Sequence, residues 1–100
     1  MKTAVIYVSG WKADEIDGYF NQLISDLNGE GIEVLENTSE VLRVIQTPKV
    51  YISFVDDERK LEGRRFDRMF RYELSRPDSK VIDMTEPIVD YVVSVEFGNR

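Results

Sequence analysis

Two apolar runs in the first and middle parts of the chain predict buried strands. Residues 3–8 form a continuous apolar and β-branched run, and continuous apolarity is typical of a central strand that is covered on both faces. Residues 50–55 alternate instead, with Val50, Ile52 and Phe54 on one side. This period of two fits a pleated strand with one fully apolar face.

Helical periodicity is clearest in residues 12–28. The apolar positions there follow the spacing of one buried helix face, formed by Ile16, Tyr19, Phe20, Leu23, Ile24 and Leu27. Acidic residues in the first turn complement the positive end of the helix dipole, and Asn28-Gly29-Glu30-Gly31 supplies a stop signal. Gly18 costs about 1 kcal/mol relative to alanine inside a helix. We interpret Gly18 as a site of close packing on the sheet.

The segment between the helix and the second apolar strand predicts further strands. Residues 32–35 form a short strand candidate, and residues 37–39 have the composition of a turn. Residues 40–46 alternate as a strand does, although Ser39 could instead cap a short helix; the β-branched content favours the strand. Thr47-Pro48 then predicts a turn that forms a hairpin with the second apolar strand.

Residues 64–73 allow two interpretations. As a strand, this segment places alternate residues on one face, namely Phe66, Arg68, Phe70 and Tyr72, with Asp67, Met69 and Arg71 opposite. As a helix, it would group Phe66, Met69, Phe70 and Glu73. We favour the strand.

The C-terminal part predicts a loop at residues 75–79, a short strand at 80–84 and a helix after it. Thr85-Glu86-Pro87 is a helix start, with a capping threonine and a proline in the first turn. As a helix, residues 86–97 would align Ile88, Tyr91, Val92 and Val95; as a strand, they would align Tyr91, Val93, Val95 and Phe97. The start signal favours the helix, and Gly98-Asn99 would end it.

These elements predict an α/β fold: a single small domain over residues 1–100, with a mixed β-sheet of about four to five strands and two flanking helices. The chain has no cysteine and no histidine. Disulfides, thiol nucleophiles, Cys/His zinc sites and Ser-His-Asp arrangements are therefore excluded. Acid–base chemistry would fall to carboxylates, lysine or tyrosine, and we expect no cofactor.

The hydrophobic runs are too short for membrane or export segments. None approaches the roughly 20 residues that span a bilayer. The N-terminal run is also shorter than the core of about 7–15 residues that a signal peptide needs. We therefore expect a cytoplasmic protein that does not contact a membrane.

Charge is distributed unevenly. The formal net charge is −6, which argues against generic attraction to nucleic acid. Residues 59–71 nevertheless contain six basic side chains against two acidic ones. We take Arg64, Arg65 and Arg68 as candidate binding residues, unless they are ordinary solvated or ion-paired surface. The expected partner is a protein, and this segment also allows nucleic acid.

Trp11 is the other candidate binding residue. It follows Ser9 and Gly10 at the carboxyl end of the first predicted strand, and ligands of open α/β sheets bind outside such ends. The alternative is that Trp11 packs at the start of the helix.

Carboxylates could instead hold a metal. Asp56, Asp57, Asp67 and Glu73 form the one plausible ligand set close together in sequence, and oxygen ligands favour magnesium or manganese. Asp67 and Glu73 would be its key members. The alternative is a charged loop followed by a strand end.

Three segments resemble a known family: residues 5–16, residues 50–54 and residues 61–73, in which Gly63-Arg64-Arg65-Phe66-Asp67 is the most specific piece. Their order over residues 3–73 resembles part of the ATPase domain of the large terminase subunits of tailed bacteriophages. The resemblance implies a phage or prophage protein with a terminase-like, ATPase-derived core.

The chain departs from that family at the residues that carry its chemistry. No G-x-x-x-x-G-K-[ST] loop occurs, so no backbone loop cradles a triphosphate. Tyr72 stands where the family has the magnesium-organising aspartate, Glu73 stands at the catalytic glutamate, and Glu62 stands where arginine is common. Nucleotide hydrolysis would then have neither positioning nor charge neutralisation. We expect a non-catalytic binding module; a carboxylate- and magnesium-dependent enzyme acting on nucleotides or nucleic acid is the alternative.

Overall fold

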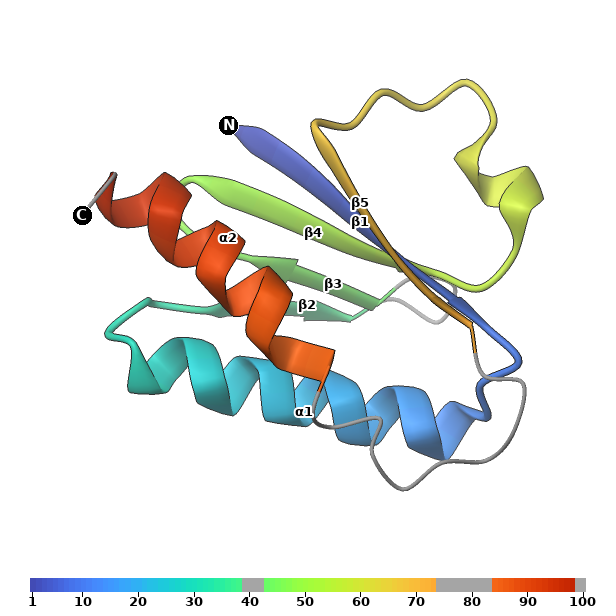
Figure 1. Ribbon diagram of the computed structural model, residues 1–100, viewed down its shortest axis with the longest axis horizontal. Coiled ribbons are helices and arrows are strands. Elements are labelled where there is room, and N and C mark those ends of the chain that lie inside the picture. The colour runs from blue at the N-terminus through green and yellow to red at the C-terminus, as the bar shows by residue number, and fades with distance from the viewer. Residues whose placement is uncertain (39–42, 74–83, 99–100) are drawn as a thin grey trace.

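The protein folds around a five-stranded mixed sheet with the strand order β2-β3-β4-β1-β5 (Figure 1). The computed structural model describes residues 1–38, 43–73 and 84–98. The strands are β1 (Lys2–Ser9), β2 (Leu35–Thr38), β3 (Arg43–Gln46), β4 (Val50–Val55) and β5 (Arg68–Glu73). The helices are α1 (Ala13–Gly29), the short 3-10 helix η1 (Glu58–Leu61) and α2 (Glu86–Phe97). The predicted α/β fold is confirmed.

The first strand occupies the centre of the sheet. β1 pairs in parallel with β4 on one side and with β5 on the other, whereas β2, β3 and β4 form an antiparallel meander. Ala4, Ile6 and Val8 face one side of the sheet, and Val5 and Tyr7 face the other; all five are buried. The prediction of a central strand covered on both faces is confirmed.

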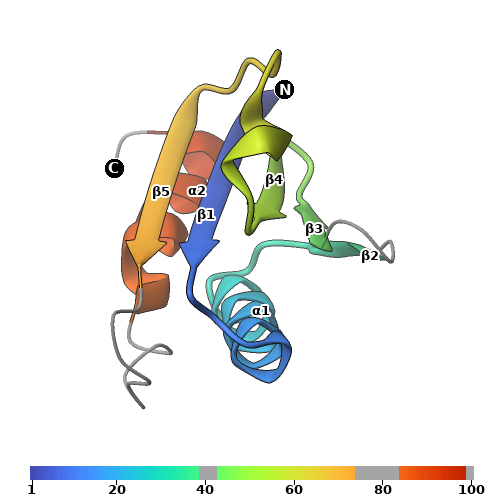
Figure 2. The same cartoon turned by 90° about the vertical axis from the view of Figure 1, so that its right-hand side faces the viewer.

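Both long helices cover the same face of the sheet (Figures 1 and 2). The predicted stripe of α1 is buried there, except for Ile24, which is half-buried. α2 contributes Ile88, Val89 and Val92 to the same core, so the helical interpretation of residues 86–97 is confirmed in spite of their β-branched content. Within the described residues, no helix is long and apolar enough to cross a membrane.

The opposite face is covered in part by the connection between β4 and β5, which carries η1 (Figure 2). Val5, Tyr7 and Val55 pack there against Leu61 and Phe66. The strand interpretation of residues 64–73 is confirmed from Arg68 onward.

Phe66 is a correction to that interpretation. It was predicted to share a face with Phe70, but the two residues pack on opposite faces of the sheet. The reason is that β5 begins only at Arg68, so the alternation of the strand does not extend back to Phe66. The backbone before the strand is not bound by this alternation, and the Phe66 ring packs against the cluster of Val5, Tyr7 and Val55.

The predictions around β2 need a further correction. The strand begins at Leu35 rather than Ile32, and it includes Asn37 and Thr38, which were predicted as turn residues. The Ile32 amide donates to the Leu27 carbonyl at 3.1 Å, and the Ile32 side chain is buried in the core. The chain therefore stays attached to the end of α1 before it reaches the sheet.

The remaining strand predictions can be judged in part. β3 and its hairpin with β4 confirm the described portion of residues 40–46 and the turn at Thr47-Pro48. The loop predicted at 75–79 and most of the strand predicted at 80–84 lie outside the described residues. Met84 is described, and it belongs to a helical turn that precedes α2 rather than to a strand.

Gly18 does not pack closely on the sheet, contrary to our interpretation. It is exposed, and a Cβ added there would meet no atom within 4 Å. Since alanine loses less conformational entropy in a helix, Gly18→Ala should raise the free energy of unfolding by about 0.5–1 kcal/mol. Urea denaturation followed by circular dichroism measures this change.

Gly63→Ala is the matched control. Gly63 also has open space around its Cβ position, but its φ is +73°, where a side chain is strained by about 1–2 kcal/mol. We expect this second variant to be destabilised. Equal changes in the two variants would contradict the assignment of the Gly18 effect to helix propensity.

Candidate functional site

The candidate binding residues lie at two opposite ends of the sheet. The parallel strands β1 and β5 run in register from Ala4 beside Arg68 to Ser9 beside Glu73. Trp11 follows the carboxyl end of β1, whereas Arg64, Arg65 and Arg68 lie at the amino end of β5. The structure therefore does not bring Trp11 and the three arginines into one site.

Trp11 is part of an aromatic cluster between α1 and β5. Its ring lies 5.4 Å from the ring of Tyr19 and 6.4 Å from that of Tyr72, measured between centroids. The side chain is half-buried, and its Nε1 has no hydrogen-bond partner among the described residues. These contacts support the interpretation that Trp11 packs at the start of the helix.

Two tyrosine hydroxyls beside Trp11 meet on one backbone carbonyl. Tyr19 and Tyr72 donate to the Met84 carbonyl oxygen at 3.1 Å and 3.0 Å. Burial raises the pKa of Tyr19 well above its ordinary value, and the neighbouring Tyr72 raises it further. Burial also raises the pKa of Tyr72. Both hydroxyls therefore stay protonated and tie the start of α2 to α1 and β5.

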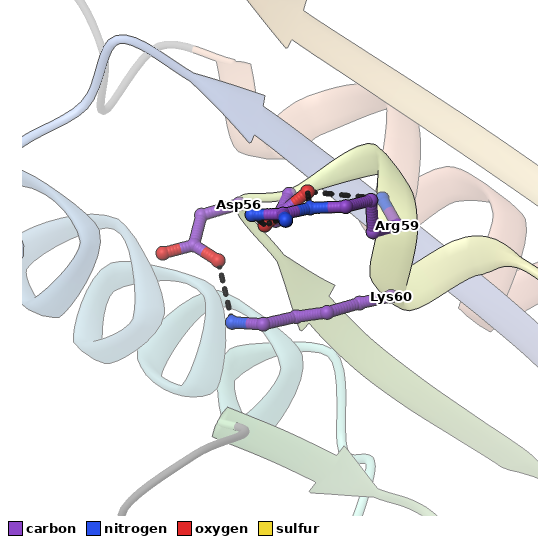
Figure 3. A network of polar contacts seen from close by, with 4 residues as sticks. Asp56, Arg59 and Lys60 are labelled. Carbon is purple, nitrogen blue, oxygen red and sulfur yellow. Dashed lines mark hydrogen bonds and ion pairs between the residues drawn. The ribbon is translucent and has the colours of Figure 1, made fainter.

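The basic residues of the segment 59–71 fall into two groups. In the first group, Lys60 pairs with Asp56 at 2.7 Å and Arg59 pairs with Asp57 at 2.9 Å. Figure 3 shows the contact between Lys60 and Asp56. Arg71 belongs to this group as well. It lies 3.7 Å from a Glu58 carboxylate oxygen, and its guanidinium carbon lies 5.0 Å from the centroid of the Tyr7 ring. The charges of this group are balanced locally.

The second group consists of Arg64, Arg65 and Arg68, which we call the arginine segment. All three side chains are exposed, and none forms an ion pair with another part of the chain that the structure describes. The Arg68 guanidinium carbon lies 5.4 Å from the centroid of the Phe70 ring, which orients this side chain. The arginine segment is thus the part of the predicted basic patch that is available for a partner.

The backbone presents the arginine segment to solvent. Gly63 turns the chain at a φ of +73°, and the Arg64 amide donates to the Leu61 carbonyl at 3.3 Å. Phe66 then anchors the segment to the apolar cluster beneath it. The result is an open hollow of about 510 Å³ lined by Thr3, Arg64, Arg65, Phe66 and Asp67. The arginines could be identified from the sequence, whereas the packing of Phe66 that holds them in place could not.

Asp67 lies apart from the other members of the proposed metal set. Asp67 immediately precedes β5 and Glu73 is its last residue, so about 20 Å of extended strand separates them. Asp56 and Asp57 follow the carboxyl end of β4, far from Asp67 at the amino end of β5. The described residues contain no group of three or more histidine, cysteine, aspartate or glutamate side chains that could hold a metal. Asp67 and Glu73 therefore cannot share one metal ion, because the strand between them is extended.

Asp67 instead forms hydrogen bonds with Thr3 near the start of β1. Its carboxylate accepts hydrogen bonds from the Thr3 amide at 2.9 Å and from the Thr3 hydroxyl at 3.3 Å. Its own amide donates to the Thr3 carbonyl at 2.8 Å. The Thr3 amide above all, and Lys2 in addition, hold the pKa of Asp67 below its ordinary value.

This pKa shift predicts a pH dependence of stability. Because the pKa of Asp67 is lower in the folded than in the unfolded chain, its contribution is present above the unfolded value of about 3.9 and is lost as the pH falls further. The free energy of unfolding of Asp67→Asn should therefore fall less than that of the wild type between about pH 5 and pH 2, where such a carboxylate becomes protonated. Urea denaturation at several pH values measures the difference. Glu62→Gln, at an exposed position, is the control, and an identical effect of both substitutions would contradict this role of Asp67.

Comparisons with protein-family models, with curated proteins and with solved structures found no match for this chain. The choice between functions therefore depends on the geometry described above.

Proposed function

We propose that this chain is a non-catalytic binding module that recognises an acidic protein partner through the arginine segment. One observation carries the proposal. Arg64 and Arg65 are exposed and have no ion-pair partner in the described part of the chain, although the net charge of the whole chain is −6. Nearby cations such as Arg59 and Lys60, by contrast, are paired with carboxylates.

Physical chemistry favours carboxylates as the ligand of these arginines. A planar guanidinium presents donors in a fork that matches a carboxylate in two parallel hydrogen bonds. Since neither Arg64 nor Arg65 has to leave an ion pair with a residue that the structure describes, a partner gains these bonds without breaking any of those pairs. Phe66, which is packed against the sheet, limits the backbone freedom that binding would otherwise remove.

A protein partner fits better than nucleic acid. Affinity for nucleic acid depends mainly on the number of phosphates that a protein neutralises. The arginine segment offers three cations; Glu62 precedes it, and Asp67 lies between Arg65 and Arg68. The negative charge of the chain as a whole would repel a long polyanion, whereas a short acidic segment of a protein would meet mainly the local positive charge.

The origin of the chain is part of the same proposal. A phage or prophage protein with a terminase-like core is supported by the three resembling segments. Two of these lie on β1 and β5, which are neighbours in the sheet with Ser9 beside Glu73. The missing phosphate loop argues that such a core would bind rather than hydrolyse. A coding sequence that lies outside any phage or prophage gene cluster would reject this origin.

Binding of a short labelled polyglutamate peptide, followed by fluorescence anisotropy at low salt, tests the proposed function. Replacing both Arg64 and Arg65 by alanine should weaken binding at least about tenfold, because two charge-assisted hydrogen-bonding groups are lost. The matched control replaces Arg59 and Lys60 by alanine, which removes the same charge from residues that are already paired. It should weaken binding much less.

A labelled DNA duplex, titrated over a salt series, distinguishes the two kinds of partner. Tighter binding of DNA than of polyglutamate, with a linear decrease of log affinity in log salt, would make phosphates the ligand and reject the protein partner. Absence of binding to both probes at low salt, where electrostatic attraction is strongest, would reject the arginine segment as a binding surface.

A further inference from the structure

We propose that the acidic segment of the partner continues from the arginine segment across the amino end of the sheet to Lys2 and Lys49. This inference rests on the proposed function and names the form of the ligand, an extended segment with two groups of carboxylates. Two open hollows carry it, because Asp67 borders both of them. The first, described above, contains Arg64 and Arg65. The second has a volume of about 660 Å³ and is lined by Met1, Lys2, Pro48, Lys49, Asp67 and Val95.

The strand pairing explains why the two hollows adjoin. β1 lies between β4 and β5 and is parallel to both, so all three strands begin at the same end of the sheet. The Lys2 amide donates to the Lys49 carbonyl at 2.9 Å, and the Asp67 amide donates to the Thr3 carbonyl at 2.8 Å. Figure 1 shows the starts of β1 and β4 and the last turn of α2 together at this end. The basic residues on both sides of β1 are therefore positioned by one sheet.

The two hollows are positively charged, although the chain as a whole has a net charge of −6. The first contributes Arg64 and Arg65, and the second contributes Lys2 and Lys49. Among the residues that line the hollows, Asp67 is the single acidic one. Charge complementarity therefore favours an acidic ligand along the whole surface, and not at the arginines alone.

The two lysines can take up new carboxylates. The Lys2 ammonium lies 4.0 Å from an Asp67 carboxylate oxygen, and 59% of the Lys2 side chain is exposed. The Lys49 ammonium donates to the backbone carbonyl of Glu96 at 3.0 Å, which orients it without neutralising it. The Glu96 carboxylate accepts instead from Thr47 and from the Lys49 amide. Within the part of the chain that the structure describes, Lys49 forms no ion pair.

The spacing of the strands specifies the ligand further. The arginines of the first hollow precede β5, and Lys49 in the second precedes β4. Neighbouring strands are about 4.8 Å apart, so about 10 Å separates β5 from β4 across β1. An extended chain advances about 3.3 Å per residue, so about three residues bridge the two groups. The ligand that fits is an extended acidic segment of a protein in which two pairs of carboxylates are separated by about three residues.

Two labelled peptides measure the contribution of the second pair of carboxylates. The two-pair peptide contains two glutamates, three neutral residues and two further glutamates; in the one-pair peptide, glutamine replaces the last two. Fluorescence anisotropy at low salt should show that the wild-type protein binds the two-pair peptide about threefold to tenfold more tightly, the range for two exposed ion pairs. In the variant with Lys2→Gln and Lys49→Gln this preference should largely disappear, because the groups that interact with the second pair are gone.

The variant with Arg59→Gln and Lys60→Gln is the matched control, since it removes the same charge from residues that are already paired. It should retain the preference for the two-pair peptide. If the variant of Lys2 and Lys49 retains the preference as well, while replacing the arginines of the first hollow still abolishes binding, the proposed function stands and the extension across the sheet is rejected. An equal loss of preference in both variants would show an effect of overall charge and would also reject the extension.

Acetylation of lysines tests the same surface in the wild-type protein and does not depend on the folding of a variant. With half of the protein bound to the two-pair peptide, acetylation of Lys2 and Lys49 should slow about twofold, because only the free protein then reacts. Mass spectrometry measures these rates. Lys12 is the internal control, since it is exposed and follows the carboxyl end of β1. Equal protection of all three lysines, or protection of none, would overturn the inference. If neither peptide binds the wild-type protein at low salt, the extension and the proposed function are both rejected.

Discussion

Replacing Tyr19 by alanine is expected to lower the free energy of unfolding by about 3–5 kcal/mol, the range observed for large aromatic side chains in protein cores. Tyr19 is fully buried. Its ring packs edge-on against Trp11 and Phe54 and at a tilt against Tyr72, with centroid distances of 5.4, 5.9 and 5.9 Å. The substitution would leave a cavity where α1, β4 and β5 meet. Urea denaturation measures the change.

Tyr19→Phe is the matched control, since it keeps the ring and removes the hydroxyl. The Met84 carbonyl would lose one of its two tyrosine donors but keep Tyr72. We expect a loss of about 1 kcal/mol, the net contribution of an ordinary hydrogen bond. If the alanine variant were no less stable than the phenylalanine variant, Tyr19 could not hold the central position in the core that its contacts indicate.

The second large effect is expected at the far end of α2. Glu96→Ala should lower the free energy of unfolding by about 1.5–3 kcal/mol, because it removes hydrogen bonds to a charged carboxylate. The Glu96 carboxylate accepts hydrogen bonds from the buried hydroxyl of Thr47 and from the Lys49 amide, the latter at 2.7 Å. One side chain thus joins the last turn of α2 to the turn between β3 and β4.

Two controls separate this contact from other effects. Glu96→Gln keeps a side-chain oxygen that can accept from Thr47, so it should cost less than Glu96→Ala. Glu86→Ala removes the same functional group from an exposed position at the other end of α2 and should have a smaller effect. Equal losses for Glu86→Ala and Glu96→Ala would show that the bonds to Thr47 and Lys49 contribute nothing.

Much of the fold could be predicted because burial leaves a periodic pattern in the sequence. The stripe of α1 and the apolar run of β1 were both correctly interpreted. Phe66 and Ile32 were misplaced because each is apolar and lies just outside a strand. The burial of Phe66 depends on the sheet residues Val5, Tyr7 and Val55, and that of Ile32 depends on the end of α1. Such contacts have no sequence period.

The candidate site could be predicted less completely than the fold. The sequence shows that residues 59–71 are rich in basic side chains, but not which of them are paired. The turn of η1 places Arg59 and Lys60 beside Asp57 and Asp56 (Figure 3), so their charges are balanced within the loop. Closeness in sequence was also misleading for Asp67 and Glu73, because an extended backbone separates them.

The central position of β1 has a consequence for the order of folding. β1 is the first strand in the sequence, yet its two neighbours in the sheet are β4 and β5, so Lys2 pairs with Val50 and Ala4 with Arg68. Closing such long loops has an entropic cost that must be met before the contacts stabilise the chain. During synthesis on the ribosome, β1 is complete long before β4 and β5 exist, so it has no neighbouring strand to pair with during that time. α1 and the β3–β4 hairpin involve local contacts and can form early, whereas the centre of the sheet is completed only after β5 has emerged.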